Sequence, residues 1–156
     1  MPETMLDRAR DFLSCKRMAL VGLERSERGF SRAVFRELVK RGYQVVPVNP
    51  GLTEAEGVRC YPRVQDIQPP VEAALLMTPP AQTAAVVREC LQAGVHRLWL
   101  HRGAGAGSAS PEAFALCNEA GVRPVFDLCP FMALPDAGFL HGLHGFFRGA
   151  DRHPAV

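Results

Sequence analysis

Hydrophobic and polar positions along the chain follow the pattern of strands joined by helices. An apolar run over 18–21 ends in Gly22, as expected for a buried strand followed by a turn. After a polar loop, apolar side chains recur at helical spacing, at Ala33, Val34, Leu38 and Val39. Gly42 ends this helix, and the apolar run over 45–48 predicts a second buried strand. Residues 18–48 are therefore predicted to form a strand–helix–strand unit.

The same alternation continues along the rest of the chain. Apolar runs predict further strands at 73–77, 98–100 and 124–126. Helical spacing and cap residues predict helices at 3–15, 81–93 and 111–120, and a single helical turn at 64–67. The segment 51–63 is polar and mixed, with one short apolar piece at Val58. In the tail after Cys129 we expect a helical middle and a frayed end.

This order of elements predicts an α/β fold. Strands that alternate with helices of about 10–13 residues favour a mostly parallel sheet with right-handed crossovers, doubly wound, with helices on both faces in three layers. In such a sheet the ligand crevice lies at the carboxyl ends of the central strands. This rule gathers four loops at one edge, namely 22–31, 49–51, 77–81 and 101–110. We expect one domain over residues 1–156.

Composition narrows the possible partners. The 156 residues are 47% hydrophobic and 22% charged, which is typical of a soluble globular domain. A net charge of +2 is too small to favour nucleic acid or a membrane surface as partner. No apolar stretch reaches the roughly 18 residues of a transmembrane helix, and the N-terminus lacks the apolar core of a secretory signal. We therefore expect a cytoplasmic protein.

Cysteine usage agrees with a reducing compartment. The five cysteines are odd in number and form no C-x-x-C pair, which predicts mostly buried, unpaired thiols and argues against a zinc site. His101 and Cys129 each follow a predicted strand. They could form a pair near the end of a ligand, but a rim histidine beside a half-buried structural thiol is the favoured interpretation. No catalytic set is recognised, so enzymatic activity stays open.

The loop after the first strand holds the residues best suited to phosphate. A tight glycine turn there directs backbone N–H groups and the positive end of a helix at an anion. Gly22 and Gly29 are present without the full G-x-G-x-x-G pattern, so a turn that merely needs a positive φ is the alternative. The candidate contact residues of this loop are Gly22, Leu23, Glu24, Arg25, Arg28 and Ser31.

The end of the second strand discriminates between nucleotides. Folds that bind NAD usually carry Asp or Glu there, to hold a ribose hydroxyl. This chain has Asn49, between Val48 and Pro50. A neutral amide repels a nearby 3′-phosphate less than a carboxylate would, and it can donate a hydrogen bond. Asn49 therefore counts against NAD.

Several short motifs along the chain, some of them described above, together resemble those of a known protein family. They are Val21-Gly22, Ser31, Gly42-Tyr43, Pro47-Val48-Asn49-Pro50, Gly57 to Pro62, Ala93-Gly94-Val95, Leu98 to His101, Glu119 to Val122 and Asp127 to Pro130. In this order and spacing, over roughly residues 15 to 135, they resemble the small bacterial and archaeal CoA-binding proteins. That family has a Rossmann-like fold related to the N-terminal CoA-binding domain of the succinyl-CoA synthetase α subunit. The remaining residues, 136–156, are a C-terminal tail.

The chain departs from the family pattern at three places. Glu24 stands where the family often has Ser, and a carboxylate beside a diphosphate costs binding unless it points away or pairs with Arg25 or Arg28. The family's Arg-rich turn after the third main strand is replaced by Met77-Thr78-Pro79-Pro80, and its Gln after Trp-Leu is replaced by His101.

The resemblance implies that the chain binds coenzyme A or a short acyl-CoA, as a non-catalytic binding or regulatory protein. The pyrophosphate would lie on the 22–31 loop and the adenosine against Val48, Asn49 and Pro50. The pantetheine arm would pass Thr78, Pro79 and Pro80 toward His101 and Gly103. A homodimer is plausible from the family. Two alternatives stay open, an NAD(P)-binding enzyme or redox sensor on the same fold and an interaction module without ligand.

Overall fold

A computed structural model describes residues 1–101 and 107–134. Its centre is a five-stranded sheet in the order β2-β1-β5-β6-β7, in which every neighbouring pair is parallel. The strands are β1 (Arg17–Val21), β2 (Gln44–Val48), β5 (Ala73–Leu76), β6 (Arg97–Leu100) and β7 (Val125–Phe126). The chain runs from β1 outward to β2, and then returns across β1 to β5. The sheet therefore has a switch point between β1 and β5, as doubly wound sheets do.

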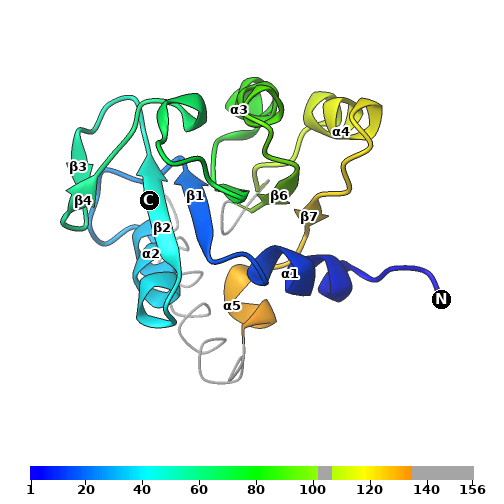
Figure 1. The fold of residues 1–156 in the computed structure, drawn as a ribbon, viewed down its shortest axis with the longest axis horizontal. Helices are drawn as coiled ribbons and strands as arrows, with labels where there is room; N and C mark the ends of the chain where they lie inside the picture. The colour runs from blue at the N-terminus through cyan, green and yellow to red at the C-terminus, as the bar shows by residue number, and fades with distance from the viewer. Residues whose placement is uncertain (102–106, 135–156) are drawn as a thin grey trace, which may run out of the picture.

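Helices cover both faces of this sheet (Figure 1). One face packs against α1 (Met5–Leu13), α2 (Phe30–Lys40) and α5 (Pro130–Ala133). The other packs against the 3-10 turn η1 (Val64–Asp66), α3 (Pro80–Gln92) and α4 (Pro111–Glu119). Successive strand side chains point to opposite faces, so Met18 and Leu20 join the first core and Ala19 and Val21 the second. The three-layer Rossmann-like α/β fold is thus confirmed.

The first helix is held against the sheet at its edge. Thr4 and Asp7 form a capping box, in which each side chain accepts from the other residue's backbone N–H. Phe12 packs edge-on against Trp99, with ring centroids 5.3 Å apart. The Trp99 Nε1–H group donates to the Leu128 carbonyl at 2.8 Å, so a single indole links α1, β6 and the segment after β7. This arrangement explains why the amphipathic 3–15 segment is helical and buried on one side.

Two details differ from the sequence predictions. Val39, expected on the buried side of α2, is 47% exposed, and Phe35 at 3% exposure takes that place. The segment 51–63, where no paired strands were expected, contains the antiparallel hairpin of β3 (Glu54–Ala55) and β4 (Val58–Arg59). Its two turn residues both have positive φ, as tight hairpin turns require. The strands are too short for periodicity to reveal them.

All five cysteines lie in the described part of the chain and are buried. Burial raises the pKa of Cys15, Cys60 and Cys117, and it raises that of Cys90 to about 12. These thiols are therefore poor nucleophiles at neutral pH. No helix in residues 1–101 or 107–134 is long and apolar enough to cross a membrane. The expected C-terminal tail, 136–156, and Gly103 lie outside the described residues.

Candidate functional site

The carboxyl ends of three strands meet at Gly22, at the switch point of the sheet. Gly22 has φ +89°, and a Cβ added to it would lie 2.9 Å from the carbonyl carbon and oxygen of Met77. Its N–H donates to the Val48 carbonyl at 3.0 Å, and the Met77 N–H donates to the Val21 carbonyl at 2.8 Å. The glycine is thus required for backbone approach between β1, β2 and β5. Its own N–H is already bonded within the protein.

Glu24 and Ser31 close the loop between β1 and α2. The Glu24 carboxylate accepts from the backbone N–H of Ser31 at 2.8 Å and from its hydroxyl at 2.9 Å. In return, the Ser31 Oγ accepts from the Glu24 N–H at 2.8 Å. Because Ser31 lies in the first turn of α2, the carboxylate occupies the position where this helix would otherwise meet an anion. Glu24 therefore points toward the helix, and among the described residues it forms no ion pair with Arg25 or Arg28.

A buried arginine holds the same loop in place through hydrogen bonds to its backbone carbonyls. Arg32 is 5% exposed, and its guanidinium donates to the backbone carbonyls of Glu24 at 2.6 Å and Arg25 at 3.3 Å. It also forms an ion pair with Glu56 at 3.0 Å. Sequence reasoning missed Arg32 as a determinant of the site. The available signal was its place in the first turn of α2, three residues before the buried Phe35, where an arginine needs a buried partner.

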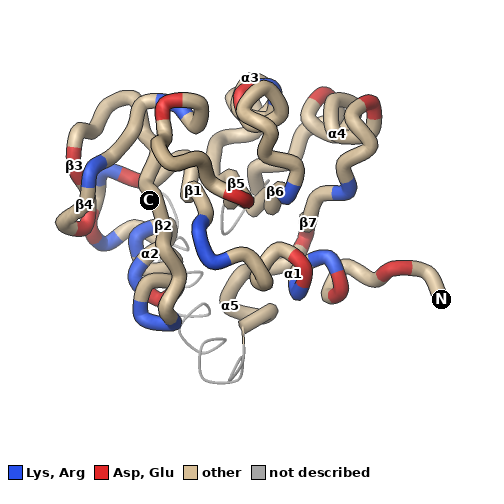
Figure 2. The backbone as a smooth tube through the Cα atoms, viewed as in Figure 1, with Lys and Arg blue, Asp and Glu red and all other residues tan. Residues whose placement is uncertain are grey.

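Glu56 links the loop to the β3–β4 hairpin. Its carboxylate is 14% exposed and accepts from Arg32 at 3.0 Å and from Arg36 at 2.8 Å. These bonds, with Arg36 contributing most, hold the pKa of Glu56 below its usual value. Beside them lies a cavity of about 410 Å³, lined by Arg25, Glu27, Arg32, Arg36, Glu54, Ala55, Glu56 and Gly57. Figure 2 shows the acidic and basic residues interspersed along these segments.

Asn49 connects the end of β2 to the first loop. Its Nδ2–H group donates to the Leu23 carbonyl at 2.7 Å, and its Oδ1 accepts from the Gly51 N–H at 2.7 Å. Both ends of the amide are therefore used within the protein. This geometry supports a role for Asn49 in orienting the two loops, and a direct hydrogen bond from Asn49 to a ligand stays a prediction. Leu23 as a whole residue is 0% exposed, and its carbonyl is already bonded to Asn49.

Buried hydrogen bonds join the loops after β5 and β6 to the end of β5. The Thr78 and Thr83 hydroxyls share a hydrogen bond of 2.7 Å, which binds the start of α3 to the end of β5. The backbone of His101 and the hydroxyl of Ser108 both donate to the Leu76 carbonyl, at 3.0 and 2.9 Å. Ser108 is 0% exposed and returns the loop after β6 to β5. Thr78 at 2% exposure is likewise covered, whereas Pro79 and Pro80 are half-buried.

An aromatic cluster lies at the carboxyl end of β6, beside the candidate site. The Phe30 ring lies 5.9 Å from the His101 ring and 5.7 Å from the Phe131 ring, measured between centroids. This contact places the first residue of α2 beside the end of β6 and the short helix α5. His101 is 9% exposed and Cys129 only 4% exposed. The burial of Cys129 supports the interpretation of a shielded thiol that belongs to the core.

The structure thus brings together three of the four expected loops, 22–31, 49–51 and 77–81. The end of β6, which leads into the fourth loop, 101–110, lies at the same edge. Gly22, Asn49, Met77 and His101 are joined by backbone or side-chain hydrogen bonds across neighbouring strands. Arg25, Arg28 and Pro50 are exposed at this edge. Any ligand bound here would meet an edge of the sheet on which the two arginines supply the positive charge.

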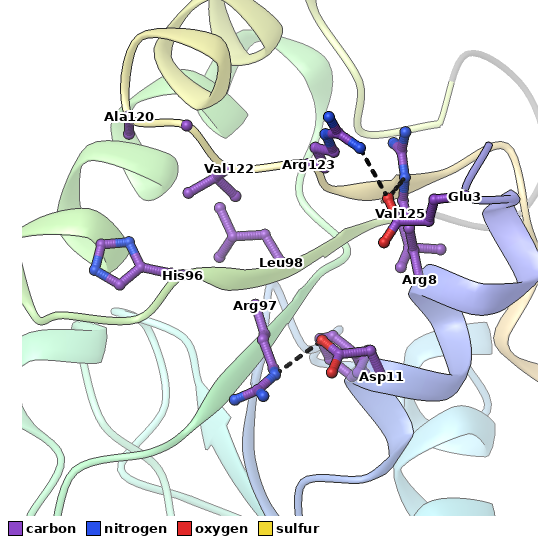
Figure 3. A pocket seen from close by; sticks show the side chains of 12 residues that line it. Glu3, Arg8, Asp11, His96, Arg97, Leu98, Ala120, Val122, Arg123 and Val125 are labelled. Atoms are coloured by element: carbon purple, nitrogen blue, oxygen red, sulfur yellow. Dashed lines mark hydrogen bonds and ion pairs between the residues drawn. The ribbon is translucent and has the colours of Figure 1, made fainter. Parts of the chain in front are cut away.

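A second cavity, of about 470 Å³, lies at the opposite end of the strands (Figure 3). It is bordered by the amino ends of β6 and β7 and by α1, and its guanidinium groups have carboxylate partners. Arg97 bonds Asp11 at 2.9 Å, while Arg8 and Arg123 both reach Glu3, at 3.0 and 3.5 Å. Because nucleotides bind at the carboxyl ends of parallel strands, this cavity is not the candidate site.

Comparisons with known proteins identify the family of the chain. The model of the CoA binding domain family matches residues 16–135, so the chain belongs to that family. An uncharacterized protein, YneT of Bacillus subtilis, is 29% identical over 114 residues, which cover 73% of this chain and 82% of the relative. A hypothetical protein from Pyrococcus horikoshii has a similar structure, with a TM-score of 0.76 and 29% identity, over 84% of this chain and 89% of that one.

A larger enzyme contains a related segment. The ADP-forming acetate–CoA ligase of Methanocaldococcus jannaschii is 28% identical over 80 residues, or 51% of this chain. The match spans only 11% of the ligase. The homology therefore concerns a CoA-binding domain and does not extend to the rest of that enzyme.

Proposed function

We propose that this member of the CoA binding domain family binds coenzyme A or a short acyl-CoA at the carboxyl edge of its sheet, as a binding or regulatory protein without catalysis of its own. The observation that carries the proposal is the geometry at Gly22. The first loop, with two exposed arginines, lies between the neutral end of β2 and the switch point beside β5, and doubly wound sheets bind nucleotides at this switch point.

The hydrogen bonds within the first loop limit where a diphosphate can lie. The N–H groups of Gly22, Glu24, Arg28 and Gly29 already have partners, as does that of Ser31. Within the described residues, the N–H groups of Arg25, Ser26 and Glu27 have none. The diphosphate would therefore bind at the exposed crest of the loop, beside the arginines, and not at the start of α2, which Glu24 occupies.

The rest of the ligand follows from the positions of the other loops. The adenosine would lie against Val48, Asn49 and Pro50 at the end of β2. The pantetheine arm would pass the half-buried Pro79 and Pro80, which offer no N–H groups and so suit a largely apolar chain. It would end near His101 and Phe30. A role in chemistry is not part of the proposal, since no catalytic set has been recognised among the described residues.

Thermal-shift measurements with CoA, acetyl-CoA, NAD and NADP at equal concentration test this proposal. A ligand that binds only the folded protein raises the melting temperature by mass action. We expect larger shifts with CoA and acetyl-CoA than with NAD, because no acidic residue at the end of β2 is present to hold a ribose hydroxyl. A larger shift with NAD would overturn the proposal in favour of a dinucleotide-binding enzyme or redox sensor.

An interaction module without ligand is the remaining candidate, and Glu24 is the observation that favours it. A carboxylate that fills the start of α2 could have replaced a bound anion altogether. No shift with any of the four nucleotides would support this candidate. Native mass spectrometry of freshly purified protein distinguishes the cases directly, because it reports a copurified ligand and the number of subunits, including the homodimer that we propose, in one experiment.

A further inference from the structure

The side chain of Arg25 crosses from the first loop to the turn after β2. Arg25 lies four residues after the end of β1, whereas Gly51 lies three residues after the end of β2. A Cβ built on Gly51 would collide with the Arg25 guanidinium, which shows that the end of this flexible side chain lies directly against Gly51. Gly51 has no positive φ, so backbone strain does not account for a glycine here.

The charge around Arg25 is unevenly compensated. Arg32 and Arg36 share the carboxylate of Glu56, at 3.0 and 2.8 Å. Within the described residues, the Arg25 side chain has no ion pair. The neighbouring cavity is lined by three arginines and three glutamates, and its formal charge is therefore zero. An anion would be attracted by the position of the Arg25 guanidinium and not by a general positive field.

The acidic residues confine that anion to one side of the cavity. Glu27 and Glu54 line the cavity together with Glu56, and they disfavour an anion in its interior. The Gly51 side of Arg25 faces the end of β2. Asn49, the side chain at that point, is neutral and committed to the bonds with Leu23 and Gly51.

We propose that Arg25 binds the phosphate group on the ribose of the nucleotide, so that the site distinguishes CoA, which carries a 3′-phosphate, from dephospho-CoA. The inference rests on the proposed function and refines it. The end of the second strand is where such folds meet the ribose, and an arginine near that point can accommodate a phosphate on it. The guanidinium can offer two parallel N–H groups to one phosphate, which a lysine cannot do.

Arg28 has a different position and provides the matched control. It is exposed, and its backbone N–H bonds the Ser26 hydroxyl at 3.3 Å on the same loop. Its charge equals that of Arg25, but only Arg25 lies against Gly51. We assign Arg28 to the diphosphate, which CoA and dephospho-CoA share.

Titration calorimetry with CoA and dephospho-CoA tests the assignment on the wild-type protein and on the Arg25→Ala and Arg28→Ala variants. We expect the wild type to bind CoA roughly tenfold more tightly than dephospho-CoA, equivalent to about 1.4 kcal/mol. Arg25→Ala should lose most of that ratio, while Arg28→Ala should weaken both ligands and keep it. Both side chains are exposed, so the variants should fold, and circular dichroism would verify this.

A third variant tests the position of the guanidinium without removing its charge. Gly51→Ala would require the end of the Arg25 side chain to move aside, and we expect it to lower the ratio between the two ligands by less than Arg25→Ala does. Equal affinity of the wild type for both ligands would overturn the assignment of Arg25 and leave the proposed function standing. A ratio that is lost in Arg28→Ala and kept in Arg25→Ala would also overturn it. Absence of binding by either ligand would contradict the proposed function itself.

Discussion

Glu24 and Ser31 are joined by three hydrogen bonds of 2.8–2.9 Å, through which the loop after β1 supplies a carboxylate to the first turn of α2. The N-cap residue of this helix is Gly29, which offers no capping side chain of its own. A Cβ on Gly29 would lie 2.5 Å from the Glu24 carboxylate, so the glycine also makes room for this contact. Glu24 therefore stabilises the helix start at the place where Rossmann-like folds commonly bind phosphate.

This relationship predicts opposite effects of Glu24→Ser on stability and on binding. Loss of the carboxylate should lower the free energy of unfolding by about 1 kcal/mol, as loss of a helix cap does. It should also raise the affinity for CoA by roughly threefold to tenfold, because a negative charge near the diphosphate is removed. Chemical denaturation and titration calorimetry on the same samples would measure both.

Glu27→Ser is the control for Glu24→Ser. It removes one negative charge from the same loop, but Glu27 has no bond to the start of α2 within the described residues. We expect little change in stability, but a gain in affinity as well, because Glu27 lies at the crest of the loop where the diphosphate would bind. Weaker CoA binding by Glu24→Ser would contradict the prediction and show that Glu24 helps to hold the loop or a cation in its binding conformation.

Gly22→Ala should destabilise the fold itself. The new methyl group would meet the Met77 backbone at 2.9 Å, and the residue would keep a left-handed φ, which costs about 1–3 kcal/mol for a non-glycine residue. Gly42→Ala is a matched control, since Gly42 has φ +92° and nothing within 4 Å of its added Cβ. Urea denaturation should show a larger loss for Gly22→Ala, by at least about 1 kcal/mol. Equal losses would mean that the contact with β5 relaxes easily.

Stability should fall in acid through Glu56. Its pKa is lower in the folded protein than the ordinary 4.5, chiefly because Arg36 and then Arg32 donate to its carboxylate. A group with a depressed folded-state pKa stabilises the fold above its unfolded pKa, and this contribution is lost as the pH falls through the folded value. Glu56→Gln should therefore cost about 1–3 kcal/mol at pH 7.

The difference between wild type and Glu56→Gln should shrink below pH 4.5, where protonation removes the same charge from the wild type. Urea denaturation at neutral and acidic pH would measure it. Glu54→Gln, on the same hairpin, has no ion pair to lose within the described residues and should change little at either pH. A difference for Glu56→Gln that is independent of pH would show that the charge of Glu56 is not what stabilises the hairpin.

Cys129 should resist modification while the protein is folded, because its side chain is 4% exposed. Incubation with oxidised CoA should leave the mass of the folded protein unchanged in intact mass spectrometry. Unfolding in urea should make the thiol reactive. An adduct of one CoA on the folded wild type, reversed by dithiothreitol and missing from Cys129→Ser, would instead place the end of the pantetheine arm at this cysteine.

Local sequence features were sufficient to predict the main sheet and the helices that cover it, but not the β3–β4 hairpin. The apolar runs at 18–21, 45–48 and 98–100 and the helical spacing between them predicted a parallel sheet with helices on both faces, because burial of apolar side chains follows the period of each element. The position of the edge that holds Gly22, Asn49 and His101 followed from the same alternation, since parallel strands bring their carboxyl ends to one side.

The direction of individual side chains at that edge was decided only by the tertiary structure. The Glu24 carboxylate, whose direction the sequence left open, bonds Ser31. The Asn49 amide, which was expected to serve a ligand, also joins Leu23 to Gly51. Arg32 was not recognised at all, although it holds the carbonyls of the loop. Glu24 and Asn49 lie in turns, where side chains follow no regular period, and Arg32 lies in the first turn of α2. Each of these polar groups bonds the partner that the neighbouring segments bring within hydrogen-bonding distance. That choice depends on residues up to 26 positions away in the chain, and no local pattern carries it.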